Sequence, residues 1–88
     1  MMEPVTLFVL KFCPYCRQAL SYLEELQKED RYKDIQINMI DEAKNRALAD
    51  SYDYYLVPTF FLGRRKLFEG AMGKEDVRNV LEEILSVA

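Results

Sequence analysis

Apolar residues recur along the first half of the chain at spacings that distinguish strands from a helix. Residues 5–10 are almost all apolar, which is typical of a central strand covered on both faces. From residue 16 to about residue 29, apolar residues recur every three or four positions and indicate a helix with one buried side. The segment 35–39 alternates instead, which predicts a strand near the edge of a sheet, with apolar positions Ile35, Ile37 and Met39.

A short helix and a third strand are predicted next. Asp41 is a suitable N-cap for the helix, because its side chain can accept hydrogen bonds from the first free N–H groups. The residues expected to face inward from this helix are Ala43, Ala47, Leu48 and Tyr52. Pro58 precedes the strand at residues 59–62, where a proline is tolerated because it stands before the hydrogen-bonded ladder.

The chain is predicted to end with a hairpin and a helix. Gly63 and Arg64 fit a two-residue type II′ turn that leads into an antiparallel strand at residues 65–69. The last helix has apolar positions spaced 3, 1, 3 and 1, namely Val77, Val80, Leu81, Ile84 and Leu85. The predicted order is β-α-β-α-β-β-α, an α/β fold in which the first helix joins two parallel strands by a right-handed crossover.

Cys13, Pro14, Tyr15 and Cys16 lie between the first strand and the first helix. Residues three apart are neighbours on a helical turn, so the two sulfurs can form a disulfide without moving the backbone. Pro14 suits the first helical position, where its missing N–H costs nothing. This placement makes Cys13 the N-cap and directs the N–H groups of Tyr15 and Cys16 towards its sulfur.

Cys13 is the expected nucleophile of the pair. A thiolate at a helix N-terminus is stabilised by unpaired N–H groups and by the positive end of the helix dipole. Such positions lower a thiol pKa from about 8.5 to between roughly 3.5 and 7.5. Cys16, one turn further in, is expected to be more buried and less ionised, and to resolve a mixed disulfide formed on Cys13.

Length, charge and cysteine usage narrow the class of protein. The chain has 88 residues, which predicts one domain over residues 1–88. Its net charge of -3 argues against nucleic acid as a partner. No apolar run approaches the roughly 20 residues that a membrane span needs, and no signal peptide is recognised. A monomer in the cytoplasm is expected, where a Cys-X-X-Cys pair is more often catalytic or metal-binding than structural.

Residues 5–85 resemble the glutaredoxin branch of the thioredoxin fold. The resemblance is carried by the tetrad Cys13-Pro14-Tyr15-Cys16 after the first strand, by Val57-Pro58 before the third, and by the order of elements. The tetrad is the one typical of dithiol glutaredoxins. The resemblance implies a four-stranded mixed sheet flanked by three helices, and a dithiol-disulfide oxidoreductase activity without a bound cofactor.

The resemblance also implies a substrate site around the two cysteines. Pro58 is expected to be cis and to lie opposite Cys13, leaving the backbone of Val57 free to pair with a substrate segment. Pro14, Tyr15 and Lys11 are the other expected contacts. The expected substrates are disulfides of proteins or mixed disulfides with glutathione, and glutathione is one expected reductant.

Two positions depart from the usual glutaredoxin pattern and leave the reductant open. Leu56 stands where threonine usually precedes Val-Pro, and the usual Gly-Gly pair is replaced by the separated glycines Gly70 and Gly73. The latter change falls at the start of the last helix, where the resemblance places the glutamyl end of glutathione. A thioredoxin-reductase-type flavoenzyme is therefore the alternative electron donor.

Other functions of the same residues stay open. Cys13 and Cys16 could hold a metal or an iron–sulfur cluster in a dimer, since one chain offers only two thiolates and no histidine. A redox-inert interaction domain is a further alternative, whereas a conventional cysteine protease is excluded by the missing histidine. Lys11 and Arg17 either help to ionise Cys13 or are solvated surface residues. Three tyrosines near Pro58 form either a contact patch or part of the core: Tyr52, Tyr54 and Tyr55.

Overall fold

The computed structural model describes residues 3–87. Its elements follow the predicted order, and their bounds are β1 (Val5–Val9), α1 (Pro14–Leu26), β2 (Ile37–Asp41), α2 (Arg46–Asp50), β3 (Thr59–Leu62), β4 (Arg65–Glu69) and α3 (Lys74–Ser86). The strands form one sheet in the order β2-β1-β3-β4. The pairing of β1 with β2 is parallel, while β1–β3 and β3–β4 are antiparallel. The predicted four-stranded mixed sheet with three helices is confirmed.

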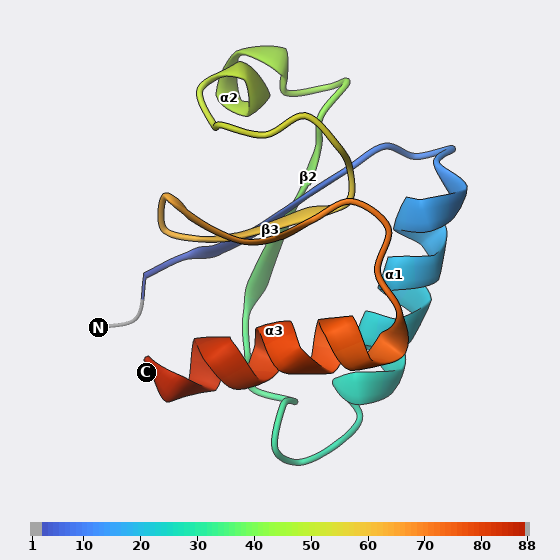
Figure 1. The fold of residues 1–88 in the computed structure, drawn as a ribbon, viewed down its shortest axis with the longest axis vertical. Helices are drawn as coiled ribbons and strands as arrows, with labels where there is room; N and C mark the ends of the chain where they lie inside the picture. Colours follow the sequence, from blue (N-terminus) through green and yellow to red (C-terminus); the bar gives the residue numbers. More distant parts are fainter. Residues whose placement is uncertain (1–2, 88) are drawn as a thin grey trace.

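The sheet separates two apolar clusters of unequal size. Helices α1 and α3 lie on one side of it and α2 lies on the other (Figure 1). Alternate residues of the central strands belong to different clusters, because successive side chains of a strand point to opposite faces of the sheet. In β3, Phe60 belongs to the larger cluster under α1 and α3, whereas Phe61 belongs to the smaller one with Phe8 and Ala49. The two central strands are therefore covered on both faces.

The first helix and the second strand are displaced from their predicted positions. Helix α1 ends at Leu26, and hydrogen-bonded turns continue the chain as far as Ile35. Strand β2 begins two residues later than predicted because Ile35 packs into the core before the pairing with β1 starts at Ile37. The predicted edge position of this strand is confirmed. The predicted division into an apolar and a wetter face is not, because Met39, expected on the apolar face, is about half exposed like its neighbour Asn38 on the other face.

The predicted start of the short helix is wrong. Asp41 is the last residue of β2, and α2 begins only at Arg46 with Asn45 as its N-cap. The Asp41 carboxylate instead accepts a hydrogen bond from the N–H of Ala43, which forms a local turn. The inward face is also different, because Ala49 is buried while Ala43, Ala47 and Leu48 are exposed.

The hairpin between β3 and β4 has the predicted turn. Leu62 pairs with Arg65, so two residues connect the strands. Gly63 has a φ of +60°, and Arg64 has no positive φ, as a type II′ turn requires. The ladder is interrupted between Phe60 and Phe61, and this irregularity was not predicted.

The last helix carries the predicted apolar face. Val77, Val80, Leu81 and Ile84 are buried and Leu85 is partly buried. The two longest helices, α1 and α3, have 13 residues each. Within residues 3–87, no helix has the length and apolar character that crossing a membrane requires.

Candidate active site

Cys13 directly precedes α1, and Cys16 lies in the first turn of this helix. Figure 1 shows where the chain passes from β1 into α1. Cys13 is the N-cap, with extended backbone angles (φ -80°, ψ 120°), and Pro14 opens the helix. Both thiols are free; Cys13 is partly exposed, whereas Cys16 is only 1% exposed. The prediction that Cys16 is more buried than Cys13 is confirmed.

The pKa of Cys13 lies below the usual value for a thiol. Burial acts to raise it, but the backbone N–H and thiol of Cys16, together with the backbone N–H of Tyr15, lower it by more. The Cys13 side chain makes no capping hydrogen bond of ordinary geometry, so these backbone groups act on the thiolate as nearby dipoles. The groups with the largest effect on the Cys13 pKa are therefore those of Tyr15 and Cys16, and no basic side chain is among them.

Cys16 has the opposite ionisation behaviour. Burial is the largest effect and raises its pKa to about 11, with further increases from Cys13 and from the negative charge of Glu42. The N–H of Leu10 lies 3.4 Å from the Cys16 sulfur and acts in the other direction. The two thiols therefore differ in both accessibility and acidity, as the sequence predicted.

The Val57–Pro58 peptide bond is cis, as expected. Because Phe8 pairs with Thr59, the next residue back, Pro58, lies at the end of the sheet from which β1 leads to Cys13. Pro58 is buried, and its C=O accepts a hydrogen bond from Gly70 (2.8 Å). Among the hydrogen bonds of residues 3–87, none involves the backbone N–H or C=O of Val57. Both groups are therefore unpaired within the part of the chain that the structure describes.

Large apolar side chains are exposed in the segments next to Cys13 and Pro58. Phe12 is 81% exposed, Tyr55 is 89% exposed, and Tyr15 and Leu56 are more than half exposed. Tyr15 was predicted as a contact, but Phe12 was missed. The signal was available, because Phe12 follows Lys11 in a loop and matches none of the periodic core positions.

A groove of about 520 Å³ runs beside Cys13. The groove lies between the β1–α1 loop and the chain at the end of β2. It is lined by Leu10, Lys11, Phe12, Cys13, Asp41, Ala43 and Lys44. Lys11 thus lies beside the nucleophile, as expected for a contact residue. Asp41, Ala43 and Lys44 were not predicted as site residues, since only the parallel pairing of β1 with β2 brings them close.

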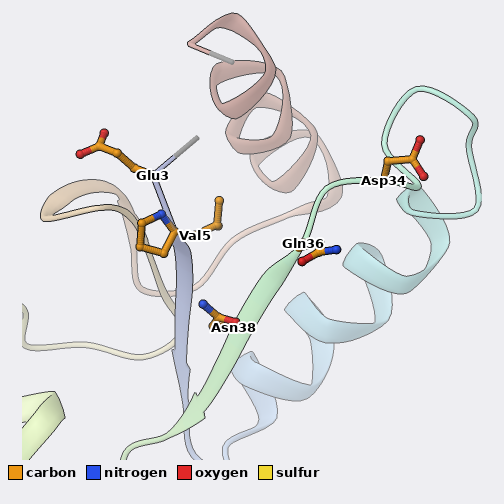
Figure 2. A pocket seen from close by; sticks show the side chains of 6 residues that line it. Glu3, Val5, Asp34, Gln36 and Asn38 are labelled. Atoms are coloured by element: carbon orange, nitrogen blue, oxygen red, sulfur yellow. The ribbon is translucent and has the colours of Figure 1, made fainter. Parts of the chain in front are cut away.

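A second cavity, of about 420 Å³, lies at the opposite end of the sheet (Figure 2). Its labelled residues come from the chain entering β1 and the first residue of that strand, and from the segment that leads into β2 and the start of β2: Glu3, Val5, Asp34, Gln36 and Asn38. Cys13 follows the other end of β1, so this cavity does not open onto the thiols. The chemistry is therefore assigned to the groove at Cys13.

The three tyrosines near Pro58 have different environments. Tyr52 and Tyr54 pack against Phe8, with ring centroids 4.9 Å away in each case. The hydroxyl of Tyr54 also donates a hydrogen bond to Glu42 (2.6 Å). These two rings belong to the smaller cluster, and only Tyr55 is free for a contact.

The start of α3 is capped by the side chain of Asp76, a residue of the same helix. Gly73 is the N-cap, and its N–H donates a hydrogen bond to the carboxylate of Asp76 (2.9 Å). An acidic side chain therefore lies where an external carboxylate would approach this helix start. Within the described residues, no three or more histidine, cysteine, aspartate or glutamate side chains form a metal-binding group.

A partly exposed and a buried thiol at the start of a helix, with a cis proline at the same end of the sheet, define the class of protein as a thiol-disulfide oxidoreductase with a thioredoxin-like fold. The family model "Glutaredoxin" matches residues 5–67. The chain therefore belongs to the glutaredoxin family, and it carries the Cys-X-X-Cys pair as Cys13 and Cys16.

Two individual comparisons extend over nearly the whole chain. A "Probable Thioredoxin" of Methanothermobacter marburgensis is 29% identical over 83 residues, covering 94% of this chain and 96% of that protein. A solved structure described as "Structure of a malarial protein" has a TM-score of 0.72 at 23% identity and covers 97% of this chain and 99% of the other. The second similarity concerns the fold alone.

Proposed function

We propose that the protein reduces disulfides through a mixed disulfide on Cys13. The Cys13 thiolate attacks one sulfur of the substrate, forming a bond to it while the other sulfur leaves as a thiolate. The geometry supports this assignment, because Cys13 is the accessible thiol and the start of α1 stabilises its negative charge.

Cys16 completes the reaction by resolving the mixed disulfide on Cys13. Its sulfur loses a proton and attacks Cys13, which forms the Cys13–Cys16 disulfide and releases the second substrate thiolate. The substrate gains two electrons and the protein dithiol loses two. With a pKa of about 11, Cys16 is a poor competitor for the first attack but lies one helical turn from the sulfur it must reach.

The proposed substrate is a protein disulfide, or a mixed disulfide with glutathione, carried next to Cys13. An extended segment pairs with the free N–H and C=O of Val57, as a strand added to a sheet edge would. Tyr15 and Pro14 are exposed on the first turn of α1, and Lys11 lines the groove beside Cys13. These residues, with Pro58, form the proposed binding surface.

The regenerating reductant is glutathione or a thioredoxin-reductase-type flavoenzyme. Membership of the glutaredoxin family supports glutathione. The separated glycines Gly70 and Gly73 and the exposed Leu56 favour the flavoenzyme, because both depart from the family's usual glutathione contacts. In addition, the N–H of Gly73 already donates a hydrogen bond to Asp76. The proposal places the protein in the cytoplasm as a monomer with one domain.

The observation that carries the proposal is the partly exposed Cys13 at the start of α1, one helical turn before the buried Cys16. It is tested by following NADPH consumption with a disulfide peptide, using either glutathione with glutathione reductase or thioredoxin reductase. We expect turnover with one donor system, and loss of turnover in Cys13→Ser. Cys16→Ser should instead accumulate a mixed disulfide on Cys13, detected by mass spectrometry. Turnover retained by Cys13→Ser would contradict the mechanism.

A further inference from the structure

Glu69, the last residue of β4, holds the loop that precedes the cis peptide bond. Its Oε2 accepts hydrogen bonds from the backbone N–H groups of Tyr55 (2.5 Å) and Leu56 (2.8 Å). Its Oε1 lies 2.7 Å from Nζ of Lys66. Both carboxylate oxygens are thus occupied, and the side chain is only 19% exposed. A side chain held at both oxygens in this way can fix the loop it contacts.

The irregularity in β4 makes this arrangement possible. In a regular strand, residues three apart point to opposite faces of the sheet. Here Phe68 pairs with Phe60 and Lys66 pairs with Phe61, which leaves Leu67 as an extra residue. The bulge therefore brings Lys66 back to the side of Glu69. Bulges often redirect side chains next to active sites, and this one completes an ion pair beside the loop.

The loop held by Glu69 leads directly into the residue proposed to pair with substrate. The backbone of Leu56 makes a second hydrogen bond, because its C=O accepts one from the Thr59 hydroxyl. Val57, the next residue, has no backbone partner among residues 3–87. The backbone N–H and C=O of Leu56 are thus satisfied, while those of Val57 are left for a partner.

Glu69 carries its charge under all ordinary conditions. Lys66, together with the N–H groups of Tyr55 and Leu56, holds the pKa of Glu69 down to about 2. The acceptor that holds the loop is therefore a carboxylate, which makes stronger hydrogen bonds than a neutral oxygen.

We propose that Glu69 is a positioning residue for polypeptide disulfides, acting through the backbone of Tyr55 and Leu56 to hold Val57 in its pairing conformation. The inference rests on the proposed substrate site. It extends that site to a charged residue on β4 that does not touch the thiols. Loss of the carboxylate should weaken substrate binding more than it slows the chemical step, because the geometry of the two cysteines is unchanged.

The test compares Glu69→Gln with the unaltered protein in single-turnover oxidation of the reduced dithiol. One substrate is a synthetic peptide closed by one disulfide, and the other is bis(2-hydroxyethyl) disulfide, which is too small to pair with Val57. We expect the half-saturating peptide concentration to rise at least fivefold with a maximal rate within twofold. The rate with the small disulfide should stay within twofold. Amide hydrogen exchange at Tyr55 and Leu56 should accelerate at least tenfold.

Glu83→Gln is the matched control. Glu83 pairs with Arg65 of β4 (3.1 Å), so its loss also removes one carboxylate and one ion pair to the same strand, but it does not contact the loop. It should behave as the unaltered protein does. An unchanged half-saturating concentration in Glu69→Gln, or an equal loss with both disulfides, would overturn the inference. If neither disulfide oxidised the dithiol of the unaltered protein to the Cys13–Cys16 disulfide, the proposed function itself would fail.

Discussion

At the scale of the residue, the two thiols differ because one lies at the end of a helix and the other lies inside it. The start of α1 provides N–H dipoles that stabilise a charge on Cys13, and the cost of burial is smaller there than the gain. One turn further on, the core around Cys16 removes water from the sulfur and favours the neutral thiol. The difference in burial between two positions one helical turn apart thus gives two identical side chains different roles.

This difference predicts ordered alkylation of the reduced protein. For both thiols, the reactive thiolate fraction rises with pH. Cys13 should react with iodoacetamide with a midpoint below that of an ordinary thiol, whereas Cys16 should react only as the pH approaches 11. Peptide mass spectrometry over a pH series measures both profiles. Equal labelling of the two cysteines at pH 7 would refute the assignment of Cys13 as nucleophile.

At the scale of the element, the β3–β4 hairpin combines a two-residue type II′ turn with a β-bulge in the pairing of its two strands. The turn depends on Gly63, whose positive φ an L-residue with a side chain rarely adopts. The bulge at Leu67 then sets which charged residues share a side of β4. The hairpin therefore contributes both to stability and to the position of Glu69.

Gly63→Ala should lower the free energy of unfolding by about 1 to 2 kcal/mol, because alanine is strained at a positive φ. A Cβ at this position would also lie 2.6 Å from Oε1 of Glu3, a flexible side chain that must move. Gly63→Asn introduces the same Cβ but tolerates the turn conformation better. Urea denaturation should show a smaller loss for asparagine than for alanine, and equal losses would rule out backbone strain as the cause.

At the scale of the whole molecule, the fold is stabilised mainly from one face of the sheet. The larger cluster contains buried residues of β1, β3, α1 and α3, while the smaller one on the α2 side is built around Phe8, Ala49 and Phe61. On the side of the larger cluster, hydrogen bonds join the segment after α1 to α3. Arg31 and the buried Tyr32 both donate hydrogen bonds to Glu82 of α3.

Leu81→Ala should therefore destabilise the protein by about 2 to 5 kcal/mol, since Leu81 is fully buried between α3 and the sheet. Leu48→Ala removes the same atoms from α2, where the side chain is 43% exposed, and should cost about 0.5 kcal/mol or less. Chemical denaturation of both variants provides the comparison. Similar losses would mean that the α2 side contributes as much as the α1–α3 side.

The sequence by itself determined the order of elements, the turn at Gly63, the apolar face of α3 and the placement of Cys13 at a helix start. These features follow from local rules, because periodicity, proline and glycine act within a few residues of one another. The cis state of Pro58 was predicted from the family resemblance.

Only the tertiary structure decided the features that depend on pairing between distant segments. Asp41 was mistaken for a helix cap because its pairing with Val9 in the parallel ladder outweighs its local preference. The groove at Cys13 and the contact of Glu69 with Tyr55 and Leu56 also join segments that are separated in sequence. Strand register sets these positions, and no pattern within one segment specifies the register of its neighbour.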